Sequence, residues 1–567
     1  MKKIFLLTLI TGVLSCNTIN HTEVIVTPKT INRIDNNMHD MPQDYKLKDF
    51  RAIAIMQDQL FFDSDATGKY LPVIEYDNSQ VNFPMLGFTL PSYIGSRGRG
   101  EALSSIGAVV GASLVGIDKS NQNGKDYVRM LKQYYNTANG EGLVLNNFSA
   151  RTGGTFWYEI FPSVGFIKLV DLYPSMNDMS DIMRNVADRW LIAIDKLLND
   201  AGYPDFDYTS FSFSKGEGID NKRWKEADAA AGVAWIEFMA YRKFGDEKYL
   251  QAAKRCMEFL ENRPLDEGPY YEILMPYGAL LAARLNAEMD YQYDVDKMIR
   301  FSIDGRNSSR KGWGMILSEI GGISMNGLVG QQSELYAFAM NTFDQLSTML
   351  PIAKYDPGYA RSIGKWALNC ISASRLFYQD EHPANRQTCY NEFLPEKFNP
   401  VCYEGVRGTL DGGRFDQYKT TLAPVGPYAV GDYKKNPRNT EGLDFCPYGS
   451  AWIGELAAIF KPTNVEGILQ LDCSITDFFN KDKYPTYLYY NPYNKAKKIS
   501  INVGNNGYDL YDTIVSGFVR KNVKGVTTIK IPAKGVSVIV LLPAGGKITQ
   551  SDKQKLMNGI VFDYGNI

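Results

Sequence analysis

Histidine is scarce in this chain, with 3 among 567 residues. Histidine clusters that bind a metal ion or carry out acid–base chemistry are therefore not expected. An excess of positive charge is also absent, because 61 lysines and arginines stand against 63 acidic residues, and this balance argues against a nucleic-acid binder. The glycine patterns of phosphate-binding loops and dinucleotide folds do not occur in a strand-to-helix setting. We therefore expect no organic cofactor and no nucleic-acid partner.

An uninterrupted apolar run of about 18 residues, as needed for a membrane-spanning helix, is missing as well. The N-terminus instead has two lysines and a short apolar run, Ile4 to Leu14, that ends at Ser15-Cys16. This layout is typical of a cleaved signal peptide, and its end resembles a bacterial lipobox, in which Cys16 is acylated. We expect residues 1–15 to be the signal and residues 16–45 to be a polar tether. The mature chain is then exported and lipid-anchored in the bacterial cell envelope, in the periplasm or at the cell surface.

The remaining cysteines show no CxxC pair and no Cys/His spacing of a zinc site, and no EF-hand spacing suggests calcium. We expect no bound metal. Disulfides in an oxidising compartment and buried free thiols both stay open. The residues concerned are Cys256, Cys370, Cys389, Cys402, Cys446 and Cys473.

Helical periodicity dominates from about residue 46 to 480, in two alternating sets of segments. One set is amphipathic, which suits an outer layer: 46–61, 124–136, 179–201, 247–262, 293–302 and 358–377. The other is rich in small and apolar residues, which suits helices buried within a ring: 101–116, 156–172, 226–243, 270–288, 327–349 and 449–460. Pairing them predicts a mainly α fold, an (α/α)6-type toroid with a long loop insertion at 378–447. An open helical solenoid is the alternative.

The hydrophobic period changes to that of strands near residue 480. Short β-branched runs such as Val536 to Leu542 are separated by Gly, Asn and Pro turns. We expect a small C-terminal antiparallel β-sandwich over residues 481–546 and a tail over 547–567.

Aromatic residues are abundant, with 36 Tyr, 29 Phe and 7 Trp. Several stand beside acids where the inner helices begin, as in Trp157-Tyr158-Glu159 and Tyr270-Tyr271-Glu272. If those helices enter from one end of the ring, their first turns surround one cavity. Rings stack on apolar sugar faces and acids accept hydrogen bonds from hydroxyls, so the pattern favours a carbohydrate site. For any single acid, helix capping is the more common role, so it is the recurrence of acids beside rings that favours a ligand site.

Two stretches carry a resemblance. The run from Glu226 to Ile236, followed by Phe244 to Lys254, resembles the helix pairs of six-hairpin glycosidases and related (α/α) toroid carbohydrate enzymes. A lipoprotein of this layout resembles the surface glycan-degrading proteins of Bacteroidota. A second stretch, Phe156 to Pro162, is similar to the Trp-rich helix of toroid polysaccharide lyases, although Phe156 stands where those lyases have Asn. The first resemblance implies a glycoside hydrolase and the second a lyase.

A glycoside hydrolase needs two carboxylates across the scissile bond, one of them protonated. The catalytic candidates are Glu159, Asp228 and Glu272, at the starts of successive inner helices, and the loop acid Glu404. We expect Glu101 and Glu334 to be less suited. The predicted substrate is an oligo- or polysaccharide.

A lyase instead removes the proton beside a uronic acid carboxylate. Tyr158, Tyr271 or Tyr403 is then the base. A non-catalytic glycan-binding surface protein is the further alternative, in which the acids only bind hydroxyls. The predicted substrate-binding residues are Arg99, Trp157, Tyr158, Trp224, Tyr270, Tyr271, Asn326, Gln332, His382, Tyr403 and Tyr448.

Overall fold

The inner helices form where alanine, glycine and leucine leave no polar face. In α7 (Ala229–Phe244) every side chain from Ala229 to Ala240 is buried. Its neighbour α8 (Glu247–Asn262) buries only one stripe, which includes Tyr249, Cys256 and Leu260. A helix that is apolar on all sides must be surrounded by others, whereas an amphipathic helix covers them. The computed structural model describes residues 26–98, 100–199, 202–392, 399–411, 415–431, 442–480, 482–551 and 553–565.

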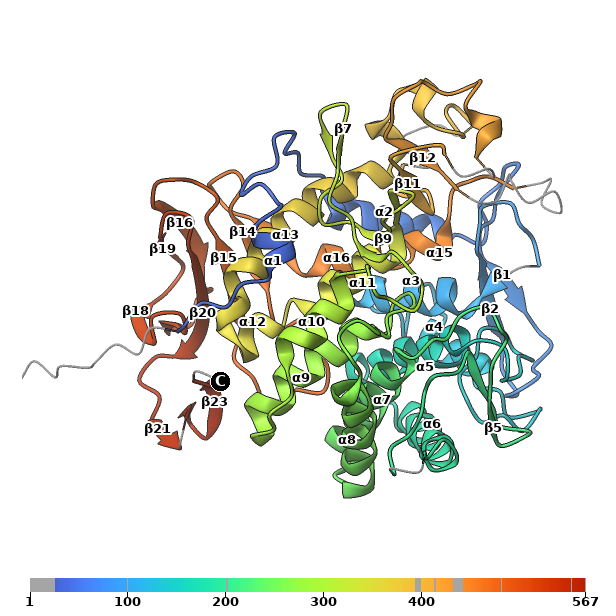
Figure 1. Cartoon of the computed structure of the whole chain (residues 1–567), viewed down its shortest axis with the longest axis horizontal. Helices are drawn as coiled ribbons and strands as arrows, with labels where there is room; N and C mark the ends of the chain where they lie inside the picture. Colours follow the sequence, from blue (N-terminus) through green and yellow to red (C-terminus); the bar gives the residue numbers. More distant parts are fainter. Residues whose placement is uncertain are drawn as a thin grey trace, which may run out of the picture.

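Within these residues, six inner helices contact one another in succession and close a ring, because the last also contacts the first. They are α3 (Ala102–Leu114), α5 (Phe156–Leu172), α7, α9 (Met275–Met289), α11 (Ala339–Met349) and α16 (Ile453–Ala458). The outer helices are α2 (Phe50–Phe61), α4 (Tyr127–Met130), α6 (Asn177–Lys196), α8, α10 (Val295–Ile303) and α13 (Ala360–Ala373). Figure 1 shows the helices side by side. The chain is thus a helical toroid with added sheets.

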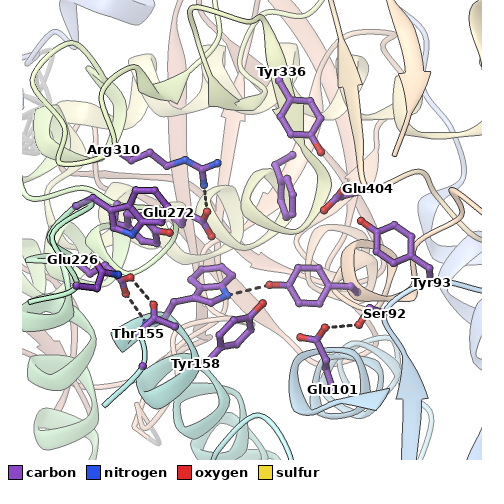
Figure 2. A pocket seen from close by; sticks show the side chains of 17 residues that line it. Ser92, Tyr93, Glu101, Thr155, Tyr158, Glu226, Glu272, Arg310, Tyr336 and Glu404 are labelled. Carbon is purple, nitrogen blue, oxygen red and sulfur yellow. Dashed lines mark hydrogen bonds and ion pairs between the residues drawn. The ribbon is translucent and has the colours of Figure 1, made fainter. Parts of the chain in front are cut away.

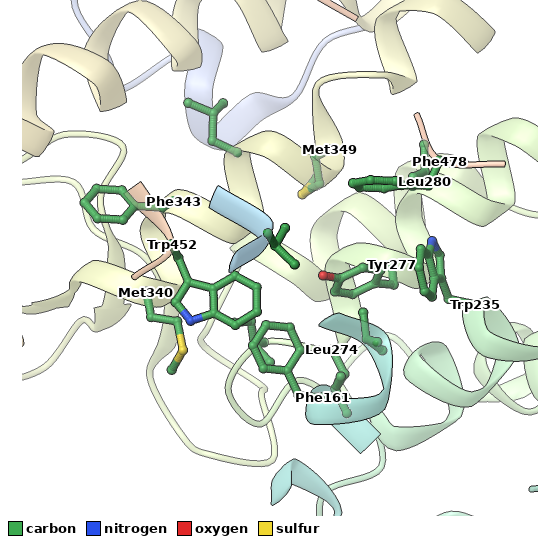
Figure 3. Packing of buried hydrophobic residues seen from close by; sticks show 14 of the residues in the cluster. Phe161, Trp235, Leu274, Tyr277, Leu280, Met340, Phe343, Met349, Trp452 and Phe478 are labelled. Atoms are coloured by element: carbon green, nitrogen blue, oxygen red, sulfur yellow. The ribbon is translucent and has the colours of Figure 1, made fainter. Parts of the chain in front are cut away.

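Aromatic side chains from the inner helices fill the middle of the ring (Figure 3). Phe161 of α5 stacks on Trp452, just before α16, with ring centres 4.7 Å apart. Trp235 of α7 meets Tyr277 of α9 edge-on at 5.4 Å. These contacts join helices far apart in sequence, so the ring is a packed core and not an open channel.

The segment 327–349, predicted as one helix, is helical only from Ala339. Its first part forms strands β9 (Val329–Gln331) and β10 (Tyr336–Phe338). These belong to an antiparallel sheet ordered β12-β11-β10-β9-β6, with β6 (Trp313–Met315), β11 (Gly405–Arg407) and β12 (Tyr428–Val430). The expected loop insertion at 378–447 therefore supplies two strands to a sheet at one end of the ring.

The C-terminal strands begin earlier than expected. A sheet ordered β13-β14-β15-β20-β17-β18 opens at Phe460 and packs through β15 and β20 on α13. Its strands are β13 (Phe460–Pro462), β14 (Leu469–Asp472), β15 (Thr486–Tyr490), β17 (Tyr508–Asp512), β18 (Gly517–Val523) and β20 (Val536–Pro543). The hairpin β16 (Lys497–Asn502) with β19 (Val526–Ile531) shares an apolar core with it. The predicted tail forms a further sheet of β21 (Ile548–Ser551), β22 (Gln554–Met557) and β23 (Ile560–Asp563).

The polar N-terminal segment is the other correction. Cys16 and the signal lie outside the described residues, but residues 26–45 are packed against the protein instead of forming a tether. Ile31, Ile34 and Met38 are buried. The Asp40 carboxylate pairs with Lys534 at 2.5 Å and accepts a hydrogen bond from Tyr490 at 2.5 Å. Apolar residues spaced among the Asn and Thr anchor this stretch.

Candidate carbohydrate-binding site

The starts of the inner helices surround one pocket of about 650 Å³, a size usual for small-molecule sites. Every inner helix contributes, as the sequence analysis expected. The lining residues are Ser92, Tyr93, Glu101, Gly154, Thr155, Trp157, Tyr158, Asn221, Trp224, Glu226, Tyr271, Glu272, Arg310, Tyr336, Phe338, Glu404 and Tyr448. The pocket thus combines aromatic rings with carboxylates (Figure 2).

Glu272 precedes α9 and forms an ion pair with Arg310. The Arg310 guanidinium also lies over the Trp313 ring, 3.9 Å from its centre. Figure 2 shows Arg310 pointing at the Glu272 carboxylate, whose side chain is 17% exposed. A neighbouring guanidinium stabilises the negative form of a carboxylate. Glu272 is therefore a partly exposed acid in the pocket with a guanidinium beside its carboxyl group.

Glu404 comes from the loop before β11 and lines the same pocket. Figure 2 shows it near Tyr336 and Tyr93, away from the Arg310 side. Its main chain is fixed, because the Ala339 amide at the start of α11 donates to the Glu404 carbonyl at 2.9 Å. Two predicted catalytic acids, Glu272 and Glu404, thus share one cavity although 132 residues separate them (404 − 272).

Glu226 and Glu101 add two further carboxyl groups to the lining. Glu226 accepts hydrogen bonds from the Thr155 hydroxyl and, at 2.8 Å, from the Trp157 amide. Burial raises the pKa of Glu226 to about 8, although both hydrogen bonds favour the carboxylate. Glu101 accepts hydrogen bonds from Ser92 and Asn146, and burial raises its pKa too.

Aromatic side chains supply the rest of the walls. The Trp157 indole donates to the Tyr448 hydroxyl at 3.0 Å. Trp224 and Tyr271 stack with ring centres 5.6 Å apart and planes 27° from parallel. Burial raises the pKa of both Tyr158 and Tyr271, so their hydroxyls are protonated at neutral pH. These neutral rings suit contact with the faces of a sugar.

Glu159 and Asp228, two of the predicted catalytic acids, do not line the pocket. Glu159 is buried and accepts hydrogen bonds from the amides of Gly153, Gly154 and Phe211, at 2.8, 3.1 and 3.2 Å. Asp228 is buried and accepts one from the Leu274 amide, at the start of α9, at 3.2 Å. Burial raises their pKa values to about 8 and about 7, respectively. Each of these two carboxyl groups thus ties the start of one inner helix to neighbouring backbone.

Several predicted binding residues also lie elsewhere. The Tyr270 hydroxyl donates to Gln345, the Tyr403 hydroxyl donates to Gln387, and the Asn326 amide donates to Glu319. The His382 ring is hydrogen-bonded to the Leu376 carbonyl, and burial lowers its pKa to about 4. Gln332 is not in the lining, and Glu334 pairs with Arg407. Arg99 lies outside the described residues.

Sequence reasoning selected Glu272, Glu404, Trp157, Tyr158, Trp224, Tyr271 and Tyr448 for this pocket, and all line it. It did not select Arg310, Tyr93 or Tyr336, which come from loops and a strand without a helix-start pattern. Glu226 had a signal, because it follows Trp224 at a helix start.

The described chain has three further features, which concern metal-binding groups, cysteines and membrane-spanning helices. It contains no group of three or more His, Cys, Asp or Glu side chains placed to hold a metal ion. Its cysteines after Cys16 are all buried and form no disulfide with one another, so buried thiols replace the disulfide alternative. None of the helices in the described ranges has the length and hydropathy to cross a membrane.

Comparison with known proteins gives distant likenesses. No family model matches the chain, and no curated protein matches it. A solved GH127 β-L-arabinofuranosidase from Geobacillus stearothermophilus T6 is similar at 12% identity, over 91% of this chain and 85% of that chain, with a TM-score of 0.38. A family 76 glycoside hydrolase from a bovine Bacteroides thetaiotaomicron strain is similar at 11% identity, over 72% of this chain and 77% of that chain, with a TM-score of 0.41. A sugar epimerase from a ruminal bacterium is similar over 72% of this chain and 98% of that chain, also with 11% identity and a TM-score of 0.41.

All three of these solved structures are named as enzymes that act on carbohydrates. Likenesses of this size are too distant to assign a family or an activity to this chain.

Proposed function

We propose that this chain is a glycoside hydrolase that cleaves an oligo- or polysaccharide with Glu272 and Glu404. In this proposal the closed ring with its outer helices is an (α/α)6 toroid, and the C-terminal sheets are a β-sandwich that supports it. The observation that carries the proposal is the meeting of these two acids, from separate segments, in one aromatic-lined pocket. A carboxylate pair on a sugar site is the arrangement that glycoside hydrolysis requires.

The two acids have different surroundings, which suits different roles. Glu272 has the Arg310 guanidinium beside it, which favours the carboxylate form, so we assign it the part of base or nucleophile. Glu404 then carries the proton, which it gives to the glycosidic oxygen as the bond to the anomeric carbon breaks. Water supplies the hydroxyl group of the new reducing end and restores the proton. Trp157, Tyr158 and Tyr448 hold the sugar ring between them.

Elimination has less support from the described residues. Tyr158 and Tyr271 do line the pocket, but burial raises the pKa of both, so little of either is in the deprotonated form that could take the proton. A lyase also needs groups that neutralise the uronate. Of the predicted binding residues that could do so, Asn326, Gln332 and His382 lie outside the lining and Arg99 lies outside the described residues. Arg310, which does line the pocket, is paired with Glu272. Hydrolysis is therefore the function that the geometry favours.

Export and anchoring through an acylated Cys16 form a separate part of the proposal. They rest on the N-terminal sequence alone. Globomycin treatment or radiolabelled palmitate incorporation in a bacterial host tests them, and replacement of Cys16 by Ser is expected to release the chain from the membrane fraction.

The decisive test uses the purified chain with a panel of neutral and uronate-containing glycans. Reducing ends and the ultraviolet absorbance of an unsaturated uronate are followed together. New reducing ends without absorbance support hydrolysis. A rise in both indicates a lyase, and binding without cleavage indicates a glycan-binding protein; either result overturns the proposal.

A further inference from the structure

One side of the pocket carries a feature that the hydrolytic machinery does not use. Trp224 lines the pocket and is 39% exposed, an unusually large exposure for this side chain. One of its faces stacks on Tyr271. An exposed indole supported by a second ring is a platform on which a further sugar can stack.

The residues next to Trp224 in the sequence are cationic. Lys222, Arg223 and Lys225 flank Trp224 in sequence, and all are exposed. We call these three residues the cationic rim. Asp220 pairs with Lys222 at 3.4 Å, but the Lys222 side chain stays 83% exposed, and such surface pairs hold little charge in place. From 220 to 225 the charges sum to +3 − 1, or +2, in a chain with a net charge of −2.

The backbone of the rim is fixed by local hydrogen bonds. The Lys222 amide donates to the Asp220 carboxylate at 2.8 Å, and the Arg223 amide donates to the Asn221 side chain at 2.9 Å. The Trp224 carbonyl accepts from the Thr209 hydroxyl at 3.0 Å. The backbone that carries the platform and the positive charges is thus fixed, and Asn221 and Trp224 of this segment line the pocket.

The inner pocket has the opposite character. Apart from Arg310, which is paired with Glu272, its ionisable side chains besides tyrosine are the acids Glu101, Glu226 and Glu404, and the lining holds no other basic side chain. A sugar that carries a negative charge is poorly matched to that interior but well matched to the rim. The two zones therefore differ in the substituents that they accept.

We propose that the Trp224 platform and the cationic rim form a subsite for an anionic sugar residue of the substrate chain, adjacent to the residue bound in the pocket. This inference rests on the proposed glycan-cleaving function. It makes the substrate a polysaccharide with carboxylate or sulfate groups outside the cleaved residue. Stacking on Trp224 holds the sugar ring, and the rim attracts the negative group.

The test measures binding separately from cleavage. The E272Q variant of the full-length chain is titrated with polygalacturonate, which carries only carboxylates, with dextran sulfate, which carries only sulfates, and with neutral dextran and xylan. We expect tight binding of at least one anionic polymer at low salt, weakening as salt is raised, and weak binding of the neutral ones. The polymer that binds identifies the anionic group.

Variants in the same background locate the site. Replacing the rim by serine (K222S/R223S/K225S) is expected to weaken anionic binding about tenfold, and W224A to weaken it by about the same factor. The matched control, K498S/K524S/K530S, removes three exposed lysines of the C-terminal sheets and is expected to leave binding unchanged. Circular dichroism verifies that each variant is folded.

Equal binding of neutral and anionic polymers, or an equal effect of rim and control variants, overturns the inference. Failure of the proposed function is a different result: the E272Q background then binds anionic polymers through the rim, while the unmodified chain yields no reducing ends from them.

Discussion

At the scale of single residues, chemistry depends on where a carboxyl group is directed. Glu272 is partly exposed and faces Arg310 in the pocket, whereas Glu159 is surrounded by backbone amides. The two acids occupy similar places in the sequence, beside aromatic residues at inner-helix starts. A single sequence predicts the local cluster but not whether the side chain points to solvent or to a loop. That direction is set by loops such as 209–211, which are distant in sequence.

Substituting Glu272 tests its catalytic assignment. The E272Q variant is expected to lower kcat by about 10²- to 10⁴-fold, because the base or nucleophile is lost, with little change in melting temperature. E404Q is expected to act in the same way through loss of the proton donor. Steady-state kinetics on the glycan identified by the panel, with thermal melts of the same samples, measure both effects.

The E159Q variant serves as the control for E272Q and E404Q, because Glu159 does not line the pocket. A glutamine amide at this position directs N–H groups at backbone donors, so we expect a loss of about 1–3 kcal/mol in unfolding free energy. Its activity should persist below the melting transition. If E159Q abolishes turnover while E272Q does not, the assignment of the two acids is reversed.

At the scale of elements, buried carboxyl groups link the starts of α5, α7 and α9, and they make stability depend on pH. Burial raises the pKa of Glu226 from 4.5 to about 8. Between these values the unfolded chain has lost the proton that the folded protein keeps, so unfolding becomes more favourable as pH rises. We therefore expect the unfolding free energy to fall from about pH 5 to about pH 8. Chemical denaturation at several pH values measures the slope.

The E226Q variant isolates one of these groups. A glutamine can accept from the Trp157 amide and donate to the Thr155 hydroxyl, so it imitates protonated Glu226. We expect this variant to reduce the slope of the unfolding free energy against pH by an amount equivalent to at most one bound proton. Glu217 is exposed in the nearby strand β5 (Glu217–Ile219), and E217Q is expected to leave the slope unchanged. An identical slope in all three proteins contradicts the role of Glu226.

The closure of the ring depends on two glycines that let α3 and α16 approach closely. A methyl group added at Gly454 would lie 2.1 Å from the Gly111 carbonyl oxygen, far inside a normal contact. We expect G454A to lower the unfolding free energy by about 1–3 kcal/mol or more, since backbone must move to make room. Gly517 in β18 meets only one atom, at 3.6 Å, so G517A is the tolerated control. Equal melting temperatures for both variants contradict this account of closure.

Elements with strong local patterns were predictable from the sequence, and those that depend on distant partners were not. The alanine-rich run of α7 predicts a buried helix, and the amphipathic run of α8 predicts a helix of the outer layer. Residues 327–338 contain two short apolar runs, 327–330 and 335–338, and short apolar runs fit helix or strand equally. They form strands because β10 pairs with β11, about seventy residues later in the chain. That partner has no trace in the local sequence.

At the scale of the whole molecule, the N-terminal segment joins the toroid to the C-terminal sheets. Asp40 contacts Arg361 of α13, Lys534 before β20 and Tyr490 of β15. Lys29 pairs with Asp356 at 2.6 Å, and the Val26 amide donates to the Ile514 carbonyl. Polar composition alone led to the prediction of a tether, because the spaced apolar residues Ile31, Ile34 and Met38 give no periodic signal.

Truncation separates a tether from a structural strap. A chain that begins at Val26 is expected to melt like the complete mature chain. A chain that begins at Leu47 exposes the apolar surface covered by Ile31, Ile34 and Met38 and loses the Asp40 contacts. We expect its melting temperature to fall by several degrees, since about 1 kcal/mol shifts a large domain by about 2–4 °C. D40N should give part of this loss, whereas D63N, at an exposed position, should give none. If both truncated chains melt together, residues 26–46 contribute no stability; if only the shorter one is destabilised, these residues are a structural strap and not a tether.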